Sequence, residues 1–188
     1  MPATIDNLDE TDWGSDAGSP PSSITLADVE RAYKVIAPLL PQTPLISHPL
    51  LSQRLGTETF VKLENAQRIG AFKIRGAINL LAGMDKKTRK KGIVTATRGN
   101  YGAALAEACA MYGAACTVFV PEGNSPDKNA AVVALGGEIV VKGHDFDAAW
   151  DASVRHARRV DAISVHPAKR PELVAGQGTV ALEMLEHS

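Results

Sequence analysis

The chain of 188 residues has little of what marks several specialised classes of protein. It contains only two cysteines, Cys109 and Cys116, and no His, Cys or acidic side chain stands beside them at metal-ligand spacing. Two cysteines cannot build a disulfide framework, so the sequence predicts two packing residues, no metal site and a reducing compartment. The chain also begins without the basic and apolar segments of a secretory signal, and we expect it to be cytoplasmic.

Net charge and long apolar runs are lacking as well. Twenty Lys and Arg oppose 21 Asp and Glu, and the formal net charge of −1 provides no global field that would draw the chain to nucleic acid or to an anionic membrane. The stretch most similar to a membrane span, residues 103–120, is rich in alanine and includes Glu107 and Gly113. A spanning helix needs about 20 strongly apolar residues. The sequence therefore predicts no nucleic-acid partner, no membrane partner and a small-molecule ligand.

What is present is the composition of an ordinary globular protein, with 45% hydrophobic and 22% charged residues. Residues 1–24 are the exception, because they hold five acidic side chains, no Lys or Arg, and a Ser-Pro-Pro-Ser segment. Such a segment cannot bury enough apolar surface to offset the entropy of ordering. We predict a disordered acidic tail over residues 1–24.

After the tail, the hydrophobic pattern alternates between the periods of helix and strand. Thr25 and Asp28 resemble a capping signal for a helix over 26–37. Strands are predicted at 59–63, 93–96, 116–120, 138–141 and 162–165, separated by helices near 74–90, 101–112, 127–135, 145–159 and 172–186. This alternation indicates an α/β fold with a mainly parallel sheet, in which ligands bind at the carboxyl ends of the strands.

Basic side chains gather in two places along these helices. Residues 86–91 hold five Lys and Arg at a predicted helix end, where they complement the helix dipole. Arg155, Arg158 and Arg159 similarly indicate a solvent-exposed helix face. Both are interpreted as solvated surface rather than as a nucleic-acid site.

Two turns between a strand and a helix hold candidate chemistry. Lys73 stands where a helix begins, and there the helix dipole and its apolar neighbours favour the free amine that a Schiff-base nucleophile needs. The second turn, residues 97–102, has two glycines three apart, so that backbone amides can point at an anion on the helix N-terminus. Each turn alone has an ordinary alternative, a solvated lysine or a plain turn. No dinucleotide or Walker fingerprint occurs, which argues against a nucleotide-binding domain.

Together the two turns resemble fold-type II pyridoxal-phosphate (PLP) enzymes of the threonine dehydratase, serine dehydratase and serine racemase group. Lys62 through Ala77 match the family run Lys-x-Glu-x-x-Gln-x-x-Gly-Ser-Phe-Lys-x-Arg-Gly-Ala, with Ala71 in place of the serine. Further similarity lies at residues 97–102, at His166-Pro167 and at the Gly-Gln-Gly-Thr segment 176–179.

The resemblance implies an activity and a set of site residues. Lys73 would hold the cofactor pyridoxal 5′-phosphate and, once released from it, remove the α-proton of an amino acid substrate. Phe72 would lie against the cofactor ring and Asn100 would bind its phenolic oxygen. The loop formed by Thr97, Arg98, Gly99, Asn100 and Tyr101 would hold the substrate carboxylate. The implied reaction is that of an ammonia-lyase, which converts L-threonine or L-serine into a 2-keto acid and ammonia.

Departures from the family pattern qualify these expectations. Arg98 replaces a small residue, including the serine that racemases use as an acid, which argues against racemisation; it could pair with a substrate acid or face solvent. Tyr101 replaces a histidine. The family's glycine-rich phosphate loop, its cation site and the Ser or Cys at the pyridine nitrogen follow the segment that ends this sequence. A catalytically inactive fragment or oligomerisation partner is therefore the alternative function.

The resemblance also implies the domain organisation. We expect a three-layer α/β/α fold of the tryptophan synthase β-like type, with an incomplete second, large domain. Residues 25–91 would carry the PLP lysine as part of the large domain, residues 92–165 would form the small domain, and 166–188 would begin the remainder of the large domain. Strands without their sheet neighbours would expose apolar edges, so we expect a homo-oligomer.

Overall fold

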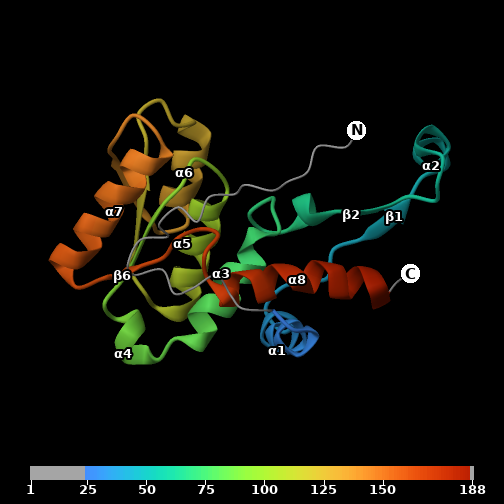
Figure 1. The fold of residues 1–188 in the computed structure, drawn as a ribbon, viewed down its shortest axis with the longest axis horizontal. Helices are drawn as coiled ribbons and strands as arrows, with labels where there is room; N and C mark the ends of the chain where they lie inside the picture. Colours follow the sequence, from blue (N-terminus) through green and yellow to red (C-terminus); the bar gives the residue numbers. More distant parts are fainter. Residues whose placement is uncertain (1–23, 187–188) are drawn as a thin grey trace, which may run out of the picture.

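The computed structural model describes residues 24–186. The tail predicted over residues 1–24 lies outside the described residues, apart from Ile24. Figure 1 shows three groups of elements: a sheet flanked by helices, a group of helices beside it, and an arm that projects away from the rest of the chain.

The sheet is parallel and has helices on both faces. Its strands β3 (Ile93–Ala96), β4 (Cys116–Val120), β5 (Glu138–Val141) and β6 (Ile163–Ser164) lie in the order β5-β4-β3-β6. Helices α5 (Tyr101–Tyr112) and α6 (Pro126–Ala134) cover one face, and α7 (Phe146–Val160) packs on the other. All four residues of β3 are buried, as expected for a strand between two helical layers. The predicted parallel sheet with flanking helices is confirmed.

A second group consists of α1 (Leu26–Ile36), α3 (Lys73–Gly83) and α8 (Pro171–Glu186). Helices α3 and α8 cross closely at two glycines: a Cβ atom on Gly176 would lie 2.6 Å from Gly76 Cα. Helix α3 also packs on α5, which joins this group to the sheet. Apolar side chains of this group, of α5 and of the sheet face that α5 covers form one core, and those between the sheet and α7 form a second, smaller cluster.

The arm was not predicted. It consists of β1 (Leu45–Ser47), α2 (Pro49–Leu55) and β2 (Phe60–Lys62), and β1 and β2 pair antiparallel as a separate two-stranded sheet. The strand predicted at 59–63 therefore does not join the parallel sheet, which corrects the sequence analysis. Apolar side chains of the arm remain exposed, including Leu50 and Leu55 at 68% and 58%.

One predicted helix is divided. The pattern over 74–90 forms α3, which ends at Gly83, and a short α4 (Lys86–Arg89). Asp85 starts the second helix, because its carboxylate accepts a hydrogen bond of 2.8 Å from the Thr88 amide. A 3₁₀ turn, η1 (Glu64–Ala66), also went unpredicted. Across residues 24–186, no helix is long and apolar enough to cross a membrane.

Candidate active site

Lys73 is the first residue of α3. The chain reaches it through η1 and a turn in which Gly70 adopts a φ of +67°, a left-handed conformation that favours glycine. The Lys73 side chain is half-buried, and its Nζ atom lies 5.8 Å from the centroid of the exposed Phe72 ring. No carboxylate within residues 24–186 pairs with this amine. The amine is thus available to a ligand that contacts the Phe72 ring.

The second predicted turn links β3 to α5. Thr97 is buried and Arg98 and Asn100 are exposed, while the Gly99 amide donates a 3.0 Å hydrogen bond to Thr97 Oγ1. Asn100 is the N-cap of α5, and its side chain makes no capping hydrogen bond. The first amides of α5 are therefore not capped by the Asn100 side chain, and they can bind an anion there.

Tyr101 faces the core rather than the turn. It is only 2% exposed, and its hydroxyl has no hydrogen-bond partner in the described part of the chain. Burial, together with the nearby Cys109 and Cys116, raises the pKa of Tyr101 above its ordinary value. Of the predicted substrate loop, Tyr101 can thus offer only its backbone. Cys109 and Cys116 are themselves buried, as predicted.

An ion pair connects the segment before Lys73 to helix α5. Arg68, in the segment that leads to Lys73, places Nε 2.8 Å from Glu107 Oε1 on α5. Glu107 is 5% exposed, and its second oxygen has no partner among residues 24–186. The sequence analysis missed this pair. Its only signal was an acidic residue inside an otherwise alanine-rich apolar helix.

Three charged residues of the Lys62 to Ala77 run, Lys62, Glu64 and Arg75, form a buried ion cluster rather than part of the reacting centre. Arg75 is 1% exposed and binds Glu64 through two hydrogen bonds of 2.8 and 2.9 Å. On its other side it binds Glu183 of α8 at 2.7 and 2.9 Å. Lys62 binds the same Glu183 at 2.7 Å and donates to the Thr43 carbonyl at 2.7 Å. The cluster joins the arm, α3 and α8.

The pKa shifts of this cluster follow from its contacts. Burial alone would lower the pKa of Arg75, but the hydrogen bonds that Arg75 donates to Glu64 and Glu183, together with the charges of these carboxylates, outweigh burial and raise that pKa. Burial would likewise raise the pKa of Glu183, and the hydrogen bonds and charges of Arg75 and Lys62 lower it instead. With Lys62 and Glu64, the cluster contains two basic and two acidic side chains, so its formal charges balance.

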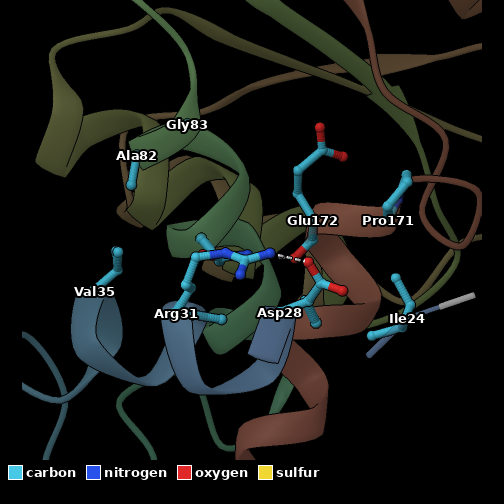
Figure 2. Close-up of a pocket in the computed structure, with 11 residues that line it drawn as sticks. Ile24, Asp28, Arg31, Val35, Ala82, Gly83, Pro171 and Glu172 are labelled. Atoms are coloured by element: carbon cyan, nitrogen blue, oxygen red, sulfur yellow. Dashed lines mark hydrogen bonds and ion pairs between the residues drawn. The ribbon is translucent and has the colours of Figure 1, made fainter. Parts of the chain in front are cut away.

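A groove between α1, α3 and α8 lies apart from the two turns. It has a volume of about 340 Å³, and neither Lys73 nor the 97–101 loop lines it. Figure 2 shows Arg31 and Asp28, both on α1 at the edge of this groove, with the Arg31 guanidinium paired to the Asp28 carboxylate. We do not assign the groove to the site.

The residues of the two turns fit the cofactor that the resemblance implies. Lys73 offers an amine without a carboxylate partner, Phe72 an exposed ring, Asn100 an exposed amide and α5 an N-terminus without a side-chain cap. These groups match the aldehyde, the ring, the phenolic oxygen and the anionic groups of a PLP–amino acid pair.

Comparison with known proteins agrees with this fit. A family profile described as "Pyridoxal-phosphate dependent enzyme" matches residues 36–188. An L-threonine ammonia-lyase of Thermotoga maritima is 36% identical over 163 residues, which cover 87% of this chain and 41% of that protein. A serine racemase of Bos taurus is 35% identical and covers 86% of this chain and 49% of that protein. The structure of maize serine racemase superposes with a TM-score of 0.82 at 33% identity, covering 86% and 49% of the two chains. The chain thus spans about half the length of these relatives.

Proposed function

Because this chain belongs to the pyridoxal-phosphate dependent enzyme family, we propose that it is the lysine-bearing half of an ammonia-lyase. Its substrate would be a hydroxy amino acid such as L-threonine or L-serine, and its products a 2-keto acid and ammonia. The observation that carries this proposal is the position of the Lys73 amine, at the start of α3 beside an exposed aromatic ring and without a carboxylate partner among residues 24–186.

Residues of the two turns would have separate roles in binding the cofactor, binding the substrate and removing its α-proton. When bound, PLP supplies an electron sink for the α-carbon of an amino acid. Lys73 would hold the cofactor and then act as the base that removes the α-proton. The uncapped amides at the start of α5 would hold the substrate carboxylate, and the exposed Asn100 amide would bind the phenolic oxygen of the cofactor.

Dehydration is favoured over racemisation by the residue at position 98. The relatives include serine racemases as well as threonine ammonia-lyases. By the resemblance, racemases carry at this position a serine that serves as an acid on the opposite face of the substrate, and here an exposed arginine takes its place. A guanidinium stays protonated at neutral pH and is a poor proton donor.

The same resemblance supports a two-domain organisation. We propose that residues 25–91 and 166–188 belong to a large domain and that residues 92–165 form the small domain. The buried ion cluster lies within the first group, since Lys62, Glu64 and Arg75 meet Glu183. The protein would act as a homo-oligomer on a small amino acid.

The test is 2-keto acid production from L-threonine and L-serine by the protein supplied with PLP. Turnover should require Lys73 and disappear in Lys73→Ala, while Lys90→Ala at an exposed surface position retains it. Turnover that survives Lys73→Ala, or formation of D-serine in place of the keto acid, would contradict the proposal. Cofactor binding without turnover would favour the alternative, a non-catalytic member of the family.

A further inference from the structure

A groove lies beside α7, on the face of the sheet opposite α5 and α6. Its volume is about 310 Å³, and its floor is formed by Phe119 of β4, Val140 of β5 and Ala152 of α7. Phe119 and Val140 are register partners, so their side chains project from the same face of the sheet. Helix α7 packs mainly on β3, β4 and β6, and the groove lies beside the helix, over β4 and β5.

Positive charge borders this groove. Lys142 stands at the end of β5, and Arg155 and Arg159 lie four residues apart on α7. All three are exposed, and none of them pairs with a carboxylate in the described part of the chain. Like charges four residues apart destabilise a helix by a few tenths of a kcal/mol. An anion between them would remove that repulsion.

An aromatic pair joins the floor to this border. The His156 ring lies 5.4 Å from the Phe119 ring at an angle of 54°. The Arg159 guanidinium lies 3.2 Å from His156 Nδ1. The groove thus combines an apolar, partly aromatic floor with cations along its edge, and no carboxylate lines it.

We propose that this groove binds a small organic dianion of the aryl or alkyl phosphate monoester class. Arginine binds a phosphate through paired hydrogen bonds, and the two α7 arginines with Lys142 provide three cations for a doubly charged group. The organic part of the ligand would lie on Phe119, Val140 and Ala152. A volume of about 310 Å³ is at the lower end of the range for ligand sites.

The groove is a different site from the one that holds Lys73, and the proposal does not depend on the proposed function. The two are nevertheless neighbours, because the Thr97 amide donates a 3.0 Å hydrogen bond to the Phe119 carbonyl. A ligand in the groove would lie one strand away from the turn that contains Arg98 and Asn100.

The experiment is a titration of the full chain with phenyl phosphate, followed by amide chemical shifts in NMR and by calorimetry. We expect a dissociation constant of roughly 0.1–1 mM, with shifts concentrated on α7 and on β5 near Lys142. Arg155→Gln and Arg159→Gln, each made alone, should bind about tenfold more weakly. Arg158→Gln removes a charge from the same helix at a position that does not line the groove, and it serves as the matched control. Lys73→Ala should bind like the unmodified chain.

Three results would overturn the proposal. The first is the absence of binding up to about 10 mM phenyl phosphate, where an affinity of this class would be saturated. The second is an equal loss of affinity in Arg158→Gln, which would show that net charge alone attracts the ligand. The third is a set of shifts confined to residues 97–102, which would place the anion at the start of α5. Circular dichroism of each variant separates loss of binding from loss of fold.

Discussion

Removing the charge of Glu183 tests the buried ion cluster most sharply. Glu183 accepts hydrogen bonds from Lys62 at 2.7 Å and from Arg75 at 2.7 and 2.9 Å, and its side chain is 4% exposed. Glu183→Gln leaves two buried cations with one carboxylate, Glu64. Breaking a buried pair by removing one partner costs about 3–5 kcal/mol. Because a domain has only about 5–15 kcal/mol of stability, we expect a large part of it to be lost.

Urea denaturation followed by circular dichroism measures this loss. With an m-value of about 2 kcal/mol per molar urea, the midpoint should fall by roughly 1.5–2.5 M at an unchanged slope. Asp161→Asn is the matched control, because it breaks the exposed pair of Asp161 with Lys91 and should cost at most about 1 kcal/mol. A loss for Glu183→Gln as small as that of the control would refute the assignment of a buried, charge-balanced cluster.

Three further predictions concern packing, pH and the segment before Lys73. Gly76→Ala should destabilise the chain by about 1–3 kcal/mol, because its Cβ would lie 2.7 Å from the Leu173 carbonyl oxygen. Gly83→Ala is the control: no atom lies within 4 Å of its Cβ, so it should leave the melting temperature nearly unchanged in thermal melts. Burial, and to a lesser degree the charge of Lys169, lowers the pKa of His166 from 6.5 to about 4 in the folded chain. As the pH falls, His166 is therefore protonated in the unfolded chain before it is protonated in the folded chain. The free energy of unfolding should therefore fall as pH drops from 6.5 to 4, and His166→Gln should flatten that slope in urea titrations. Arg68→Ala leaves the buried Glu107 carboxylate without its partner; we expect a loss of about 1–3 kcal/mol and faster hydrogen exchange over residues 67–72, and unchanged exchange there would argue against the pair.

Local signals allowed much of the sheet to be predicted from the sequence. The bounds of β3, β4, β5 and α5 agree with the prediction, because each of these elements carries its own apolar pattern. Gly113, for example, ends α5 in the left-handed conformation that a helix end favours. The two candidate turns follow from the same alternation.

Features that depend on distant residues could not be predicted in this way. The strands β1 and β2 pair only with each other: the strand at 59–63 was predicted, but its partner β1 was not, because three residues are too short to show a strand pattern. Glu183 lies 108 residues from Arg75, so nothing local in the sequence connects the two charges. The inward orientation of Tyr101 likewise depends on the core that surrounds it.

The measurement that tests the central claim most directly is a titration of the chain with PLP, followed by borohydride reduction and peptide mapping of the labelled lysine. The account predicts a single label on Lys73 at sub-stoichiometric PLP, and no label in Lys73→Ala. Labels spread over exposed lysines such as Lys86 and Lys90, or no label at all, would contradict the assignment of Lys73 as the cofactor-binding residue.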